Sequence, residues 1–231
     1  MQEKYTIEPI AHIHTDFKDK FGIPRQSGRV DELCGTVVFE PKYRNPDALR
    51  EIESFSHLWL IFQFSMATGK TSDKWSPTVR PPRLGGNKKV GVFASRSPFR
   101  PNFLGLSCVR LVSVRQTEHH GLVLDVAGVD LLDGTPIIDI KPYLPFADCR
   151  PGAVGGYADA EESHRLRVDF PEELLSRLPE DKRDAAIACL AEDPRPSYQN
   201  DSRVYTMVYA DLEIDFTVTD GIATVVDVRQ P

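Results

Sequence analysis

The segment from Gly91 to Ser107, GVFASRSPFRPNFLGLS, disfavours a helix in the middle of the chain. Pro98 and Pro101 fix their own φ angles and bias the residues before them toward extended backbone. Arg96 and Arg100 therefore lie on a stiff loop, four residues apart. Two guanidinium groups on such a loop favour binding of a carboxylate or a phosphate, and a surface loop with solvated arginines is the equally good alternative.

Positive charge is concentrated around this loop. The segment from Arg80 to Arg115 contains no aspartate or glutamate, although the whole chain has a formal net charge of −6. Its basic residues are Arg80, Arg83, Lys88, Lys89, Arg96, Arg100, Arg110 and Arg115. This segregation of charge indicates an anionic partner.

A long irregular segment, from Ser65 to Asn87, leads into the basic stretch. It shows no clear periodicity, and Trp75 is an aromatic residue among its cations. A loop of this length inside a compact domain is typical of a functional segment. Packing of Trp75 onto the core is the alternative, and both interpretations stay open.

Short β-branched and aromatic runs predict that the first part of the chain is mostly strand. The expected strands are Tyr5–Ile13, Thr36–Phe39, His57–Phe64, Cys108–Val114, Leu122–Val129 and Thr135–Ile140. The run at His57–Phe64 is apolar on both faces, which predicts a central strand. Asn45 and Pro46 predict the start of a short helix through Ile52. The dipeptide Asp133–Gly134 predicts a tight hairpin turn.

Asp139 and Lys141 interrupt the apolar run that ends at Pro142. A carboxylate and an amine among apolar residues need either polar partners or a chemical role. An internal ion pair and a functional role are both consistent with this pattern.

The composition changes beyond Pro151. Residues 159–193 contain eleven acidic and five basic residues, opposite in sign to the basic stretch. Two short helices, Pro171–Leu178 and Asp181–Leu190, and three strands, Val204–Ala210, Glu213–Thr219 and Ile222–Val228, are expected here. The sequence therefore predicts a first domain at residues 1–150 and a small α+β domain at residues 151–231.

Several classes of protein are disfavoured. No apolar run is long enough to span a membrane, and the N-terminus lacks the pattern of a signal peptide, so we expect a cytoplasmic protein. The four cysteines are far apart and form no CxxC pair, which suits reduced, mostly buried thiols and argues against a metal site. The chain has no GxSxG motif of a hydrolase and no GxGxxG dinucleotide fingerprint.

The run GVFASRSPFRPN resembles the signature of the TsaA-like, or TrmO, family of tRNA methyltransferases. The resemblance extends to PRQ (residues 24–26), FSHLW (55–59), TVRPPRLGGN (78–87), DGTP (133–136) and DIKPYLPF (139–146), and DPRPSY (193–198) resembles a motif of bacterial members. Members usually have RPNPIG where this chain has Phe103 and Leu104 after Asn102. Loss of the second proline predicts a less rigid loop, with both arginines retained.

The resemblance implies a small β-barrel that binds S-adenosylmethionine without a Rossmann fold, in a homodimer with the cofactor near the subunit interface. It implies methylation of N6 of threonylcarbamoyladenosine at tRNA position 37, in the anticodon loop. The implied cofactor contacts are Pro24, Arg25, Gln26, His57, Leu58, Arg96, Leu106, Asp133, Gly134, Thr135 and Pro136. Of these, Arg25 or Arg96 suits the methionine carboxylate, Leu58 and Leu106 suit apolar contact, and the backbone of residues 133–136 suits the adenine edge.

Chemical roles for the remaining residues follow from the implied reaction. The N6 group carries a carbamoyl substituent, so a base that removes its proton assists methyl transfer. Asp139 is the expected base, with Lys141 and Tyr143 as positioning groups. The expected RNA contacts are Arg80, Arg83, Lys88, Lys89 and Arg100.

Two other functions compete with this hypothesis. A methyltransferase of the same architecture acting on a different substrate would keep the cofactor motifs. A non-catalytic RNA- or anion-binding module would keep the basic loop and would not need PRQ or DGTP.

Overall fold

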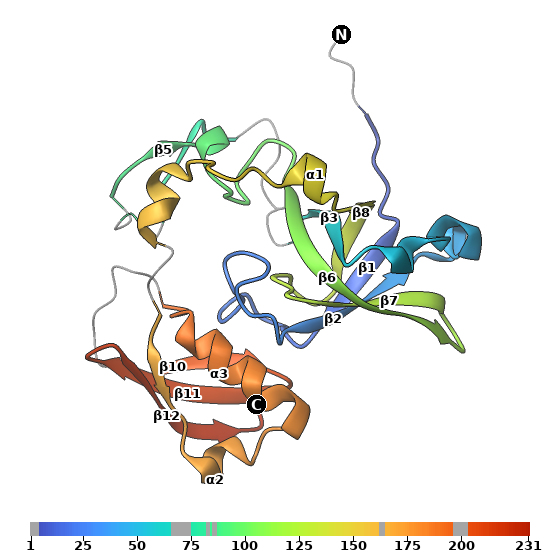
Figure 1. The fold of residues 1–231 in the computed structure, drawn as a ribbon. Helices are drawn as coiled ribbons and strands as arrows, with labels where there is room; N and C mark the ends of the chain where they lie inside the picture. Colours follow the sequence, from blue (N-terminus) through green and yellow to red (C-terminus); the bar gives the residue numbers. More distant parts are fainter. Residues whose placement is uncertain (1–4, 66–74, 82–83, 85–86, 162–164, 196–202) are drawn as a thin grey trace.

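The computed structural model describes residues 5–65, 75–81, 84, 87–161, 165–195 and 203–231. The first part of the chain forms a closed barrel with the strand order β1-β2-β7-β6-β3-β8 (Figure 1). Its strands are β1 (Ala11–Thr15), β2 (Cys34–Phe39), β3 (His57–Gln63), β6 (Leu104–Thr117), β7 (Gly121–Ala127) and β8 (Thr135–Pro142). The prediction of a mainly β fold with a small barrel is confirmed.

The barrel core follows from the alternation of side chains along its strands. Leu58, Leu60 and Phe62 of β3 point inward and are 0%, 0% and 4% exposed. The strand lies between β6 and β8, and because the barrel is closed it has neither central nor edge strands. Gly105 of β6 faces Phe62, and a Cβ atom there would lie 2.2 Å from the ring. Glycine is therefore required for β6 to approach β3.

Short helices connect and flank the barrel strands. They are the 3-10 helices Pro41–Tyr43, Pro46–Leu49, Ile52–Ser54, Val92–Ala94 and Gly156–Glu161, and α1 (Pro145–Asp148). The Asn45 side chain caps the second of these by accepting a hydrogen bond from the Asp47 amide (3.0 Å). The predicted helix through Ile52 is interrupted because Glu51 has a φ of 68°. No helix in the described ranges is long and apolar enough to cross a membrane.

A second sheet, with the order β10-β11-β12-β9, lies near the C-terminus (Figure 1). It contains β9 (Arg167–Asp169), β10 (Tyr205–Tyr209), β11 (Leu212–Thr219) and β12 (Ile222–Arg229). The helices α2 (Glu172–Leu175) and α3 (Arg183–Ala191) belong to this part, with a 3-10 turn at Glu180–Lys182. The predicted α+β arrangement is present, and β9, which pairs in parallel with β12, is an addition to it.

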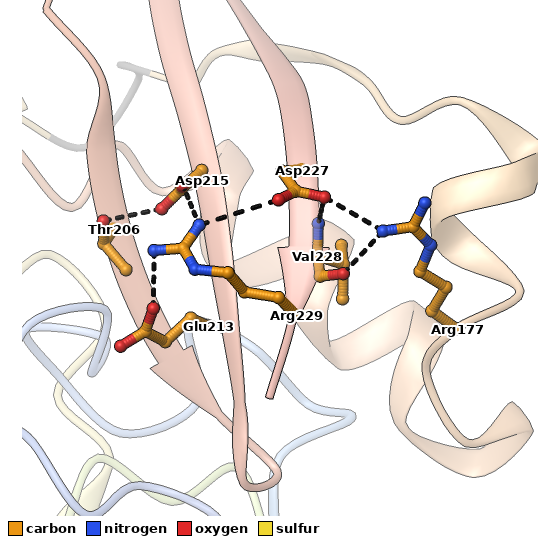
Figure 2. A network of polar contacts seen from close by, with 7 residues as sticks. All are labelled: Arg177, Thr206, Glu213, Asp215, Asp227, Val228 and Arg229. Carbon is orange, nitrogen blue, oxygen red and sulfur yellow. Dashed lines mark hydrogen bonds and ion pairs between the residues drawn. The ribbon is translucent and has the colours of Figure 1, made fainter. Parts of the chain in front are cut away.

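One face of this sheet carries a charge network (Figure 2). Asp215 and Asp227 are directly opposed on β11 and β12, where two like charges would repel. Arg229 contacts both carboxylates and also Glu213 (2.5 Å), while Arg177 donates to Asp227 (2.9 Å). Burial raises the pKa of Asp215, but hydrogen bonds from Arg229 and Thr206 outweigh it and hold this pKa below its ordinary value. The network is accounted for by sheet stability.

Two predictions about local structure are wrong. Asp133–Gly134 forms a turn, but β7 and β8 are not neighbours, because β8 pairs with β1 and β3. The cysteines are free, as expected, but only Cys189 is buried, whereas Cys34 and Cys149 are exposed. A hairpin dipeptide specifies a local turn and not the partners of the strands beside it.

Candidate functional site

One end of the barrel gathers the segments that carry the predicted motifs. At this end β1 and β7 finish, while β6 and β8 begin. Residues 16–33, 92–103 and 128–134 leave or enter the barrel here. Motifs far apart in the sequence therefore meet around one rim.

Gln26 and Arg96 meet at this rim although they are 70 residues apart. Nη1 of Arg96 donates a hydrogen bond to Oε1 of Gln26, and the Arg96 side chain is otherwise exposed. Arg100 is used differently, because its Nη1 donates to the carbonyl oxygen of Ser95 (3.1 Å) and closes the loop on itself. Arg96 is thus the guanidinium available to a ligand, and Arg100, expected to contact RNA, supports the loop.

Phe103 occupies the position at which the RPNPIG motif of the resembled family has its second proline. Its φ is 53°, a left-handed conformation that proline cannot adopt. Two backbone hydrogen bonds hold it, from the Phe103 amide to Arg100 (3.2 Å) and from the Phe64 amide to the Phe103 carbonyl (2.8 Å). These backbone hydrogen bonds therefore hold the loop at the position where a proline ring is absent.

Asp130 is a candidate site residue that the sequence analysis did not single out. The Ser107 hydroxyl, inside the barrel, donates to its carboxylate (2.6 Å). Burial raises the pKa of Asp130 to about 6, against the opposing effects of Ser107, backbone amides and the charge of Arg96. A single acidic residue within the apolar run from Val126 to Leu132 was the available signal.

The turn at residues 133–136 is attached to β1. The amides of Asp133 and Gly134 donate to the carbonyls of Phe17 (2.8 Å) and Ile13 (2.9 Å). The Asp133 carboxylate also accepts from the Thr15 amide (3.1 Å) and lies 3.2 Å from Nδ1 of His14. These two amide donors are therefore already used within the protein. Thr135 is buried and Pro136 pairs with His12 of β1.

Other expected cofactor and catalytic residues lie on the outer face of β6, β3 and β8. Leu106 is 52% exposed and pairs with Ile61, which pairs in turn with Asp139. Trp59 occupies the next row, between Cys108 and Lys141. This outer face places Leu106 and Asp139 two strands apart on one surface.

Of the two alternatives for Asp139 and Lys141, an internal ion pair is disfavoured, because both side chains are exposed on that face, 4.0 Å apart. Tyr143 packs its ring against those of Trp59 (5.8 Å) and His57 (6.2 Å) at the far end of β3. The Leu58 side chain points into the barrel core and is 0% exposed, so it is not available for the expected apolar contact with the cofactor.

Neighbouring residues of the segment 24–26 contact different parts of the protein. Gln26 contacts Arg96, whereas Nη2 of Arg25 donates to the carbonyl oxygen of Arg195 in the C-terminal part (2.9 Å). A cavity of about 210 Å³ beside Pro24 and Arg25 includes neither Arg96 nor Leu106. Arg96 is consequently the better candidate for a ligand carboxylate.

Glu192 links the C-terminal part to the same barrel loop. It is 8% exposed and forms ion pairs with Arg29 and Arg165, both at 2.8 Å. Beside it, Arg195 and Asp193 form a second buried pair (2.8 Å). The segment at 192–195 therefore fixes the loop that carries Arg25 and Gln26.

The first cations of the basic stretch lie on a short two-stranded ribbon. Val79 of β4 (Thr78–Val79) pairs with Val90 of β5 (Val90–Gly91), and Arg80, Lys88 and Lys89 are exposed beside this pair. Arg83, also expected to contact RNA, lies outside the described residues.

The residues at the rim fit the amino-acid end of S-adenosylmethionine. Arg96 offers an exposed guanidinium for a carboxylate, and Asp130, whose pKa responds to the charge of Arg96, offers a carboxylate for an ammonium group. In the part of the chain that the structure describes, no group of three or more His, Cys, Asp or Glu residues could hold a metal ion.

Comparison with known families covers nearly the whole chain. The family model described as the tRNA-methyltransferase O N-terminal domain matches residues 12–149, and that of the TrmO C-terminal domain matches residues 163–231.

Individual proteins agree with these matches. A tRNA (adenine(37)-N6)-methyltransferase from Escherichia coli (strain K12) is 40% identical over 226 residues, 94% of each chain. A putative S-adenosylmethionine-dependent methyltransferase from Pseudomonas aeruginosa is 39% identical, over 91% of each chain. A crystal structure of TrmO from the latter organism has a TM-score of 0.78 and 33% sequence identity, covering 100% of this chain and 99% of that one.

Proposed function

Since this chain belongs to the TrmO family of tRNA methyltransferases, we propose that it methylates N6 of threonylcarbamoyladenosine at position 37 of tRNA. S-adenosylmethionine is the proposed cofactor, and supplies the methyl group on its sulfonium. The contact between Gln26 and Arg96 carries the proposal, because it joins two of the family-like motifs at an exposed guanidinium. We keep residues 1–150 as the proposed catalytic domain and 151–231 as the C-terminal domain.

In this proposal the rim residues bind the cofactor and orient it. Arg96 holds the carboxylate of the cofactor, and Asp130 neutralises the adjacent ammonium. Leu106, exposed on the outer face, provides apolar contact. Fixing both reactants in line supplies most of the rate enhancement, because the nucleophile and the methyl group no longer have to find each other.

A homodimer is part of the proposal. Leu106 and Phe99 are 52% and 47% exposed, which is high for large apolar side chains near a proposed site. A second copy placed over this surface would enclose the cofactor, which the rim of one chain leaves open. The enzyme is proposed to act in the cytoplasm on the anticodon loop of tRNA.

Calorimetry with S-adenosylmethionine and transfer of a labelled methyl group to tRNA test the proposal together. We expect cofactor binding and transfer to tRNA. Binding without transfer to any tRNA would favour a different substrate, and RNA binding without cofactor binding would favour the non-catalytic module.

Asp139→Asn is expected to lower the single-turnover rate of methyl transfer by about 10²- to 10⁴-fold, the usual contribution of a general base. The Asp139 side chain is 51% exposed, so folding and cofactor affinity should be unchanged. Rapid-quench measurement at saturating cofactor gives the rate, and Asp47→Asn, another exposed carboxylate, is the control. A wild-type rate in Asp139→Asn would show that this carboxylate removes no proton.

Replacing both Lys88 and Lys89 by glutamine is expected to weaken tRNA binding and to make its salt dependence shallower. Each lost phosphate contact lowers the slope of log affinity against log salt by about 0.7 to 0.9. A filter-binding salt series measures the slope. The double change of Lys18 and Lys42 to glutamine removes the same charge outside the basic stretch and should leave the slope unchanged. Equal slopes for wild type and the Lys88/Lys89 variant would move the RNA surface elsewhere.

A further inference from the structure

Two exposed aromatic side chains lie at one end of the β4–β5 ribbon. The rings of Trp75 and Phe93 have centroids 5.8 Å apart and planes inclined by 36°. Trp75 is 43% exposed and Phe93 is 73% exposed, so the pair is not part of the barrel core. The alternative that Trp75 packs its loop onto the core is therefore disfavoured.

The backbone around this pair is held in place. Val92, next to Phe93, is 1% exposed, and its amide donates to the carbonyl of Pro77 (2.9 Å). The Tyr157 hydroxyl donates to the carbonyl of Ala94 (3.0 Å), which attaches residues 156–161 to the ribbon beside β5 (Figure 1). The rings are thus presented on a fixed support, which lowers the entropic cost of binding.

Charge at the other end of the ribbon indicates the partner. The pairing of Val79 with Val90 places Arg80 beside Lys89, with Lys88 next to it. Lys89 precedes β5 and Phe93 follows it in the 3-10 helix Val92–Ala94, so the two residues are four positions apart and at most about 14 Å from each other. No ion pair with these three cations occurs among the described residues. A single-stranded nucleic acid uses both features, stacking its bases on aromatic rings and placing its phosphates beside cations.

We propose that Trp75 and Phe93 form a stacking platform for an unpaired base of the tRNA anticodon loop. This inference rests on the proposed tRNA substrate, and it assigns the aromatic end of the ribbon to the base and the basic end to the phosphates. Neither ring is among the proposed cofactor contacts, although Phe93 lies only three residues before Arg96, so we expect the pair to act on RNA affinity and not on cofactor affinity.

Fluorescence titration with a synthetic anticodon stem-loop RNA tests the platform, without cofactor or turnover. The chain has two tryptophans, Trp59 and Trp75. RNA should quench the wild-type emission; Trp75→Phe should keep the affinity but lose most of the quenching. Trp75→Leu and Phe93→Leu should each weaken binding by about fivefold to a hundredfold, the range for one base–aromatic stack, with an unchanged salt slope. Phe146→Leu, at an aromatic residue 85% exposed outside the basic stretch, is the control.

Affinities within twofold of wild type in both leucine variants would overturn the platform. A change of molecular mass by light scattering in these variants alone would also overturn it, because a second copy would then cover the rings. If the variants lose RNA affinity while the wild type methylates no tRNA, the platform holds and the proposed function fails.

Discussion

Replacing Arg96 by alanine is expected to weaken S-adenosylmethionine binding by about ten- to a hundredfold, in a protein that stays folded. The lost interaction is a charge-assisted hydrogen bond to the cofactor carboxylate, worth about 1.5–3 kcal/mol. The side chain is exposed and its hydrogen-bond partner is Gln26, so its removal opens no cavity in the core. Calorimetry gives the affinity, and the thermal transition reports folding.

Matched variants separate charge from geometry at this position. Arg96→Lys keeps the charge but loses the planar fork, so it should recover only part of the affinity. Arg110→Ala removes the same charge from an exposed position on β6 opposite His57, and should bind as the wild type does. Wild-type affinity in a folded Arg96→Ala protein would remove Arg96 from the cofactor site.

Glu192→Ala is expected to lower the free energy of unfolding by about 3 kcal/mol. Deleting one partner of a buried ion pair costs about 3–5 kcal/mol, because the remaining charge is left without compensation. The effect should fall at the lower limit, since the Arg165 side chain is 60% exposed and water can reach it, whereas Arg29 is only 24% exposed. Chemical denaturation measures the loss.

An exposed pair between the same two parts of the chain provides the control. Lys18 and Asp211 lie 2.6 Å apart with side chains 62% and 74% exposed, so Asp211→Ala should lower the free energy of unfolding much less than Glu192→Ala does. Equal losses in the two variants would mean that Glu192 does not fix the barrel loop. Cofactor affinity should also fall in Glu192→Ala, because that loop carries Gln26.

Local sequence patterns predicted a strand or helix well where the burial of its own side chains determines the conformation. The run at His57–Phe64 predicted β3, because its alternating residues fill the barrel. The strand β9 was missed because three residues, Arg167–Asp169, are too short for a pattern and are stabilised by pairing with β12. Propensity has little weight where tertiary pairing determines the conformation.

The site was less predictable than the fold because its contacts join distant segments. Motif resemblance pointed to both Gln26 and Arg96, but no spacing in the sequence predicts that they touch. Asp130 went unnoticed because its importance comes from its contact with Ser107 and its proximity to Arg96. Arg96 and Arg100 are similar residues on one loop, but their guanidinium groups reach different acceptors. Arg96 donates to the Gln26 side chain, and Arg100 donates to the backbone carbonyl of Ser95.

The central proposal is tested most directly by the identity of the methylated nucleoside. Purified protein, S-adenosylmethionine and tRNA with or without threonylcarbamoyl on adenosine 37 are incubated, and the nucleosides are analysed by mass spectrometry. We expect one added methyl group on threonylcarbamoyladenosine from position 37, and none on tRNA that lacks this modification. Equal methylation of unmodified adenosine 37, or a methyl group at any other position, would contradict it.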